Sequence, residues 1–318
     1  MLRISSSATK ILSLVLVICL LFSCAQTTED GDNSETVTFT DALDREVNVA
    51  QNVDRVACLI GSFADVWMLA GGNVCATADD AWEDFGLDLK DAVNIGGAHS
   101  PSLELVIASD PDFVIASAST ASNVEMKDVL ENAGITVAYF DVDNFDDYLK
   151  MLDICTDITG RKDLYDQNGL AVKMSIENIK NKVKQINIPE NDRKILLLRA
   201  SSGFVKVKGS EGTILGEMLA DLGLVNIADS DATLLENLSV ESVIKQEPYR
   251  IFVVTMGSDT DKAMKSLDKL LSENPAWMQL EAIKENRLYV MDRTLFNIKP
   301  NAKWAKSYEK IKEILLDK

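Results

Sequence analysis

A long proline-free stretch, from Arg161 to Ile188, does most to limit how this chain can fold. Its apolar residues recur at spacings of 7, 4, 3, 4 and 3, which places them on one face of a helix. At ~1.5 Å per residue such a helix runs roughly 40 Å, the length of a whole domain. We therefore expect one long helix that joins two lobes. The apolar face consists of Tyr165, Val172, Ile176, Ile179, Val183 and Ile186.

Short apolar strands alternate with helical stretches on both sides of this segment, after a hairpin signal around Asp41–Asp44. Continuous apolar strands with helical crossovers imply parallel sheets covered on both faces. We predict an α/β fold with two Rossmann-like lobes, residues 37–160 and 189–318, whose parallel-rich sheets are joined by the helix 161–188 and enclose a ligand cleft. The expected strands are Val56–Ile60, Val74–Ala78, Phe113–Ala116, Thr136–Phe140, Lys194–Arg199, Ile251–Thr255 and Leu288–Met291. The expected helices are Phe63–Ala70, Leu103–Ala108, Val124–Ala133, Phe145–Ile158, Ile214–Leu222, Val240–Gln246, Asp261–Leu271 and Ala302–Leu316.

The first residues carry an export signal. Arg3 and Lys10 precede an apolar run from Ile11 to Phe22, which is followed at once by a polar tract. A transmembrane helix needs about 20 apolar residues, so this run is typical of a signal peptide that is removed. We assign residues 1–23 to that signal peptide.

The end of the signal, Leu21-Phe22-Ser23-Cys24, resembles a lipobox, in which the cysteine is acylated and becomes the mature N-terminus. The alternative is an ordinary buried thiol beside an ordinary cleavage site. Residues 24–36 are too polar to pack and are predicted to form a flexible tether. We expect an exported protein, anchored by lipid on the outer face of the cytoplasmic membrane or in the periplasm.

The acidic composition excludes two classes of partner. The chain has 50 acidic and 32 basic residues and a net charge of −18, which becomes more negative when the signal is removed. Such a surface repels nucleic acids and anionic lipid headgroups. The remaining cysteines, Cys58, Cys75 and Cys155, are odd in number and lack CxxC spacing, so no structural disulfide framework is expected.

The motifs of the common α/β enzymes are missing from this sequence. It has no Gly-rich phosphate loop of Walker or dinucleotide type, no GxSxG and no HExxH. Its one histidine, His99, cannot build a zinc or manganese site of the kind that uses several histidines. We therefore predict a protein that is not an enzyme, with no resident metal and no cofactor.

Five segments, in this order and spacing behind a lipobox, carry a family resemblance. They are Thr38–Val47, Asp54–Val56, Ser102–Ile115, Asp221–Ala228 and Asn274–Trp277. The chain resembles the lipoproteins that bind iron-siderophore, haem or cobalamin for ABC importers, the class III periplasmic binding proteins. The resemblance implies a monomer that captures a chelated iron complex, above all a ferric siderophore, and delivers it to an ABC permease dimer and its ATPase. Haem or a corrinoid is the alternative ligand, and an α/β enzyme that uses the cleft is a remote alternative.

Loops after the strands are expected to line the cleft, because ligands bind beyond the carboxyl ends of parallel strands. Trp82 would stack on a ligand or pack against the core. Arg199 would bind a carboxylate, catecholate or hydroxamate oxygen, or else pair with an acid. His99 would contact the ligand or haem iron, or remain a solvated loop residue, and Lys206 and Lys208 share one face of a strand-like stretch. The candidate ligand-binding residues are Ser62, Phe63, Trp82, His99, Ser119, Arg199, Phe204, Lys208, Met256 and Phe296.

Two acids match positions that the family uses to dock with the permease. Glu104 and Glu241 each follow a serine by two residues and open a predicted helix. The resemblance implies that each enters a basic pocket on one half of the permease. The alternative is that each carboxylate only complements the dipole of its helix.

Overall fold

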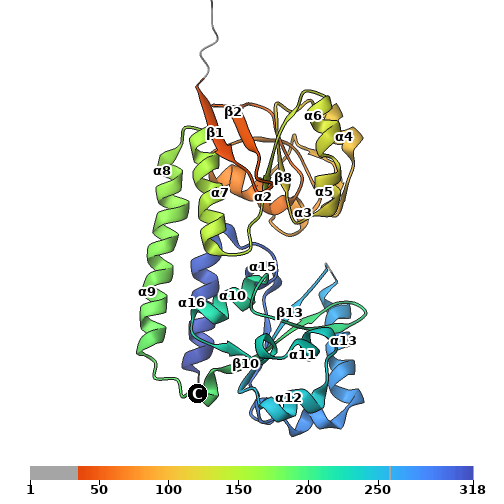
Figure 1. The fold of residues 1–318 in the computed structure, drawn as a ribbon, viewed down its shortest axis with the longest axis vertical. Coiled ribbons are helices and arrows are strands. Elements are labelled where there is room, and N and C mark those ends of the chain that lie inside the picture. The colour runs from red at the N-terminus through yellow and green to blue at the C-terminus, as the bar shows by residue number, and fades with distance from the viewer. Residues whose placement is uncertain (1–34, 258, 318) are drawn as a thin grey trace, which may run out of the picture. The chain divides into compact units, whose positions relative to one another are not determined.

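A five-stranded sheet, in which all neighbouring strands run parallel, forms the first lobe (Figure 1). The computed structural model describes residues 35–257 and 259–317 of the chain. All five residues of Phe113–Ser117 are buried, because alternate side chains enter two hydrophobic clusters on opposite faces of the sheet. The strand order is β5-β4-β3-β8-β9, with β3 at Val56–Cys58, β4 at Val74–Thr77, β5 at Val93–Asn94, β8 at Phe113–Ser117 and β9 at Thr136–Phe140.

An antiparallel hairpin precedes this sheet, as the turn residues predict. Strands β1 (Thr36–Thr40) and β2 (Glu46–Ala50) pair along their length. The carboxylate of Asp41 closes the turn by accepting hydrogen bonds from the backbone N–H groups of Leu43 and Arg45, at 2.9 and 3.1 Å. The helices of this lobe are α2 (Gly61–Leu69), α3 (Asp80–Glu83), α4 (Leu103–Ala108), α5 (Ala121–Glu125), α6 (Lys127–Asn132) and α7 (Phe145–Ile158), and the short strands β6 (Gly96–Gly97) and β7 (Ser100–Pro101) pair with each other.

The segment predicted as one helix, Val124–Ala133, belongs to two short helices that meet at Met126. In a continuous helix the carbonyl of Asn123 would accept a hydrogen bond from the N–H of Lys127. Here it accepts one from the Tyr139 hydroxyl at 2.9 Å and one from the N–H of Met126 at 3.3 Å. A tertiary hydrogen bond therefore divides the helix.

The predicted linking helix is present and contains one irregular turn. It consists of α8 (Lys162–Tyr165), a π-helical turn (Asp166–Leu170) and α9 (Ala171–Gln185). Gly169 lies in the π-helical turn, where an added Cβ would be 3.1 Å from a methyl group of Leu149. The predicted face is confirmed, since Ile176, Ile179 and Val183 are buried and the other three residues pack partly against the core. Figure 1 shows α9 beside the last helix, α16 (Trp304–Leu316).

The second lobe has a five-stranded sheet that includes one antiparallel strand. Strand β11 (Val205–Lys208) runs antiparallel to β10 (Lys194–Ala200), whereas the remaining pairs are parallel. The order is β11-β10-β13-β14, with β13 at Arg250–Thr255 and β14 at Leu288–Met291, and β12 (Val225–Asn226) also pairs with β10. The α-helices are α10 (Ile214–Asp221), α11 (Ala232–Glu236), α12 (Val240–Gln246), α13 (Thr260–Glu273), α14 (Glu281–Lys284) and α15 (Arg293–Phe296), and 3₁₀ turns lie at Asn191–Arg193, Ile227–Ser230, Pro275–Gln279 and Asn301–Lys303.

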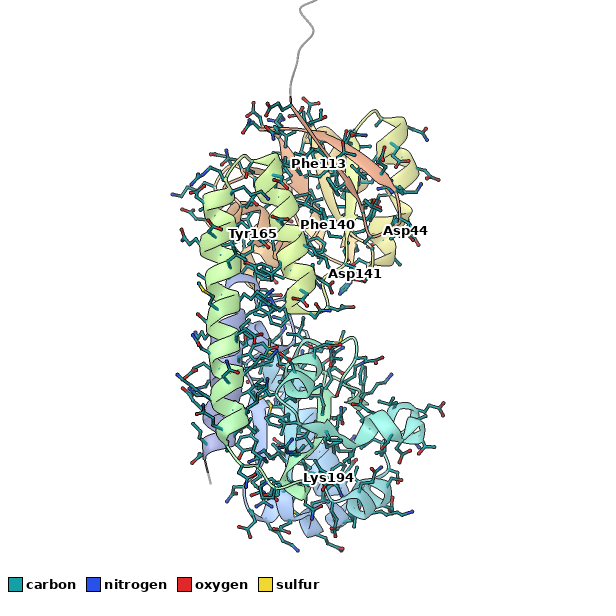
Figure 2. All side chains as sticks on the ribbon, turned by 60° about the vertical axis from the view of Figure 1, so that its left-hand side comes forward. Asp44, Phe113, Phe140, Asp141, Tyr165 and Lys194 are labelled. Carbon is teal, nitrogen blue, oxygen red and sulfur yellow. The ribbon has the colours of Figure 1, made fainter. Side chains whose placement is uncertain are left out.

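Both sheets point their carboxyl ends toward the space between the lobes. Phe113, at the start of β8, lies far from the second lobe, whereas Phe140 and Asp141, at the end of β9, lie toward it (Figure 2). Lys194, at the start of β10, lies at the far end of the second lobe (Figure 2). The loops after the strands therefore meet between the lobes.

The chain returns to the first lobe after α15. The buried amide of Asn301 donates to the carbonyl of Ser62 at 2.9 Å and to the carboxylate of Asp65 at 2.8 Å. Trp304, at the start of α16, packs its ring against Phe145 of α7, with ring centres 5.8 Å apart. One hydrophobic cluster consequently runs through the first lobe, the linking helix and the second lobe.

The three cysteines of the described part are free thiols. Cys58 and Cys75 lie on the neighbouring strands β3 and β4. Burial raises the pKa values of the Cys58 and Cys155 thiols well above the ordinary value for cysteine, so both thiols stay protonated at neutral pH. The predicted signal peptide, the lipobox with Cys24 and nearly all of the tether lie outside the described residues. Within the described ranges, no helix is both long and apolar enough to span a bilayer.

Candidate functional site

A cavity of about 580 Å³ lies between the carboxyl ends of the two sheets. Its first-lobe wall comes from the segments after β3, β4, β6 and β8, and its second-lobe wall from the end of β10, the loop after β13, and the start of α15 with the residues that follow this helix. This is where the strand-end rule places a ligand. The lining residues are Ile60, Ser62, Asp79, Asp80, Glu83, Asp84, Phe85, Ala98, His99, Ser117, Ser119 and Thr120 of the first lobe, and Arg199, Met256, Gly257, Arg293, Asn297, Ile298 and Lys299 of the second.

Another hollow of similar size, about 590 Å³, lies against the linking helix. Residues of α7, α9, α10 and α16 line it, and part of its surface is already engaged in structural contacts. Asp221, for example, binds the Lys180 ammonium at 2.7 Å and the Tyr308 hydroxyl at 2.8 Å. The cavity at the strand ends is therefore the better candidate for a ligand site.

The first-lobe wall is acidic because one short segment folds tightly against the start of α2. Gly61 begins α2, and an added Cβ there would lie 2.4 Å from the backbone nitrogen of Ala81. This close approach lets the Asp80 carboxylate accept a hydrogen bond from the Gly61 N–H at 2.9 Å. Burial, together with the charges of Asp84 and Asp79, raises the pKa of Asp80 to about 6.

The second-lobe wall carries a cation that has no acidic partner. Arg199 lies near the end of β10, is half-buried, and makes no ion pair with any described residue. Its Nε is buried and has no hydrogen-bond partner within the described ranges. Burial lowers the pKa of this guanidinium, although an arginine of this kind stays charged at neutral pH.

Two lysines add to the positive charge beside Arg199. Lys206 is paired with Arg199, and Lys208 with Leu197, across β10 and β11, so the three cations share one face of the sheet. Burial, and then the charges of Arg199 and Lys206, lower the pKa of Lys208. A cationic face of this kind favours anionic or oxygen-rich ligands.

One ion pair crosses the cavity from lobe to lobe. Arg293, at the start of α15, binds Asp84 of the first lobe with both terminal nitrogens. Lys299 also lines the cavity, and burial lowers the pKa of its ammonium while the charges of Asp143 and Asp141 oppose that shift.

Five of the ten candidate ligand-binding residues line the cavity. They are Ser62 at the start of α2, His99 and Ser119 in first-lobe loops, and Arg199 and Met256 in the second lobe. His99, Ser119 and Met256 are exposed, whereas Ser62 is buried. Their contact with a ligand stays a prediction.

The other five candidates do not line the cavity. Three of them are aromatic residues whose rings pack in the hydrophobic core. Phe63 and Phe296 are 0% and 2% exposed, and Trp82 is half-buried against the same cluster, so these three rings pack in the core and do not line the cavity. Phe204 is exposed beyond the cavity with the Lys206 ammonium 5.1 Å from its ring centre, and Lys208 lies beside Arg199 without reaching the lining.

Six charged residues of the wall were not among the candidates. The available signal for the four acids was the acid-rich run that follows a strand, Asp79-Asp80-Ala81-Trp82-Glu83-Asp84. Nothing in the local pattern distinguishes the two cations from other surface residues. The six are Asp79, Asp80, Glu83, Asp84, Arg293 and Lys299.

The two acids considered for permease docking are exposed at the starts of helices. Glu104 is the second residue of α4, and Glu241 the second residue of α12. Each helix is capped by the preceding serine, Ser102 or Ser239, and Glu241 also accepts a hydrogen bond from the Ser239 hydroxyl at 3.0 Å. Neither acid forms an ion pair with a described residue.

Comparison with known proteins agrees with this architecture. An iron-uptake system-binding protein of Bacillus subtilis is 24% identical over 256 residues, covering 78% of this chain and 77% of that protein. An Fe(3+)-citrate-binding protein of the same organism is 23% identical over 307 residues, covering 91% and 90%. The petrobactin-binding protein YclQ of Bacillus subtilis superimposes with a TM-score of 0.72 at 19% identity, covering 89% of this chain and all of that one. Residues 56–295 match the periplasmic binding protein family, and the chain belongs to that family.

Proposed function

We propose that this protein is the extracytoplasmic solute-binding component of an ABC importer and that it captures a chelated iron complex, above all a ferric siderophore. The iron complex is its cargo and not a resident cofactor. The observation that carries the proposal is the half-buried guanidinium of Arg199, which lies on the wall of a cavity between two lobes and pairs with no acid in the described part of the chain.

The isolation of this cation is informative because acids are abundant. The chain has 50 acidic and 32 basic residues, so an unpaired arginine beside two lysines is not explained by a shortage of carboxylates. Leaving a partly buried charge without a partner costs free energy unless something else satisfies it. The carboxylate, catecholate or hydroxamate oxygens of an iron chelate would do so.

The size of the cavity also suits a chelate. Small-molecule sites usually enclose about 300–1,000 Å³, and this cavity encloses about 580 Å³. The related proteins named above bind iron citrate or petrobactin, according to their names, and belong to iron uptake. These similarities support an iron chelate as the ligand.

Haem or a corrinoid is the alternative ligand, and the lining of the cavity argues against it. Either ligand would need broad apolar walls. Of the five large apolar candidates, Phe63, Trp82, Phe204, Met256 and Phe296, only Met256 lines the cavity. The larger apolar side chains of the lining are Ile60, Phe85, Met256 and Ile298, and seven charged side chains lie among them. The remote alternative of an α/β enzyme that uses the same cleft is less well supported, because the family consists of binding proteins.

The partners follow from the same proposal. The two lobes would dock on a dimeric permease through Glu104 and Glu241, with the ATPase on the far side of the membrane. Acylation at Cys24 would hold the protein, as a monomer, at the outer face of the cytoplasmic membrane. The strongly negative charge disfavours nucleic acids as partners.

A titration of purified protein with ferric siderophores, ferric citrate, haemin and cobalamin tests the function. We expect binding of at least one iron chelate, and we expect Arg199→Gln to weaken it about tenfold to thirtyfold, as for a hydrogen bond to a charged group. Arg161→Gln, which removes an exposed cation outside the cavity, is the matched control. If none of these compounds binds, the proposed function is wrong. If binding is unchanged in Arg199→Gln, the site lies elsewhere.

A further inference from the structure

The two walls of the cavity carry opposite charges. Four carboxylates line the first-lobe wall, all from the segment Asp79–Asp84. Three cations line the second-lobe wall, namely Arg199, Arg293 and Lys299. Helices α3 and α15, which carry charges of the two walls, lie on facing sides of the lobes (Figure 1). Asp84 and Arg293 neutralise each other across the gap, so the remaining charges stay available to a ligand.

Asp79 and Glu83 make no ion pair with any described residue. Asp79 is half-buried and lies between the end of β4 and the start of α3, and Glu83 is exposed at the end of α3. Their negative potential reaches neighbouring groups. The charge of Asp79 contributes to the raised pKa of Asp80, and that of Glu83 to the raised pKa of Arg293. A cation placed here would meet a field that already favours it.

A purely anionic chelate does not match this wall. An anionic group held close to one of these carboxylates would be repelled, and the repulsion grows as water is excluded from the cavity. Arg199 and Lys299 face the same space and attract anionic or oxygen-rich groups. A ligand that satisfies both walls therefore needs both kinds of group.

We propose, building on the function proposed above, that the cavity is specific for an iron chelate that carries a protonated amine. The oxygen donors around the iron lie against Arg199, and the ammonium group lies between Asp79 and Glu83. Arg293 is already bound by Asp84, so the ammonium of the ligand pairs with Asp79 and Glu83, the two acids of this wall that make no ion pair with a described residue.

A matched pair of ligands tests this proposal. Ferrioxamine B is a trishydroxamate iron complex with one free ammonium, and N-acetylferrioxamine B has the same iron-binding groups without that charge. We expect isothermal titration calorimetry to show about tenfold or tighter binding of ferrioxamine B, as for a hydrogen-bonded pair of charges. The preference should disappear in the double variant Asp79→Asn, Glu83→Gln, and should persist in Asp91→Asn, which alters an exposed first-lobe acid outside the cavity.

The possible results separate this proposal from the proposed function. Equal binding of the two ferrioxamines, or a preference that survives in the double variant, overturns the amine proposal while an iron chelate remains the cargo. Binding of ferric citrate or haemin, without either ferrioxamine, also overturns it and leaves a solute-binding protein. Failure of these four compounds, and of the other siderophores and cobalamin in the titration described above, overturns the proposed function itself.

Discussion

Asp84 and Arg293 hold the two lobes together from opposite sides of the cavity. The Arg293 Nη2 donates to Asp84 Oδ2 at 2.7 Å, and Nη1 donates to Oδ1, so the guanidinium and the carboxylate meet edge to edge. Their side chains are 19% and 14% exposed. The pair joins the end of the α3 segment to the start of α15, two elements separated by 209 positions in the sequence. It fixes one edge of the cavity before any ligand arrives.

Asp84→Asn should destabilise the protein, because it leaves a partly buried guanidinium without its counter-charge. We expect a loss of about 2 kcal/mol in the free energy of unfolding, measured with urea, less than for a fully buried pair because water reaches the cavity. Asp88→Asn is the control, since its pair with Lys90 is 78% and 81% exposed and should contribute almost nothing. Equal effects of the two substitutions would show that the Asp84–Arg293 pair does not stabilise the fold.

Asp80 should make stability depend on pH between about 4 and 6. Its pKa is raised from 3.8 to about 6, so the folded protein holds this proton more tightly than the unfolded chain. The free energy of unfolding should therefore fall as pH rises through that window, by up to about 3 kcal/mol, and stay level above it. Asp80→Asn keeps an acceptor for the Gly61 N–H and should be more stable than the native protein at pH 7. If native and variant proteins show the same pH dependence, Asp80 ionises normally.

The sheets and the linking helix could be predicted because their patterns are local and strong. Phe113–Ala116 is apolar and entirely buried, and Ile176, Ile179 and Val183 recur at helical spacing. The π-helical turn could not be predicted, because it depends on how Gly169 packs against Leu149 and Leu152. The strand that pairs with the stretch at Lys206 and Lys208 could not be predicted either, because its antiparallel pairing with β10 depends on the tertiary fold.

The position of the site was more predictable than its residues. The rule that ligands bind at strand ends correctly places the cavity beside the end of β10 and the loops after β3, β4, β8 and β13. Which side chains enter it depends on short-range geometry. Ser62 lines the cavity while the next residue, Phe63, is 0% exposed, because one turn of α2 aims successive side chains in different directions. The pairing of Asp84 with Arg293 required the contact between lobes.

Cys24→Ala should release the protein from the membrane after export. Cys24 belongs to the lipobox-like sequence and lies outside the described residues. It precedes the first strand, which begins at Thr36, so its replacement should not alter the two lobes. Fractionation of cells should find the variant in the medium or periplasm, and its thermal unfolding should match that of the purified native protein without its anchor. A variant that is exported but stays in the membrane fraction would show that Cys24 is not the anchor.

The last prediction separates two roles for the acids at the helix starts. If Glu104 and Glu241 only complement their helix dipoles, each contributes about 0.5 kcal/mol, and replacing them lowers stability slightly while transport continues. If they dock with basic pockets on the permease, Glu104→Arg and Glu241→Arg should leave ligand affinity unchanged and abolish uptake, because like charges would then face each other.

Both side chains are exposed and make no ion pair with a described residue, so charge reversal should not disrupt the fold. Glu125→Arg, at an exposed acid on α5, is the control for a general effect of added positive charge. Ligand affinity and cellular uptake should be measured on the same variants. Normal uptake by the variant that carries both Glu104→Arg and Glu241→Arg would exclude these residues from docking, whereas lost uptake with intact binding, and normal uptake by the control, would assign them to the permease interface.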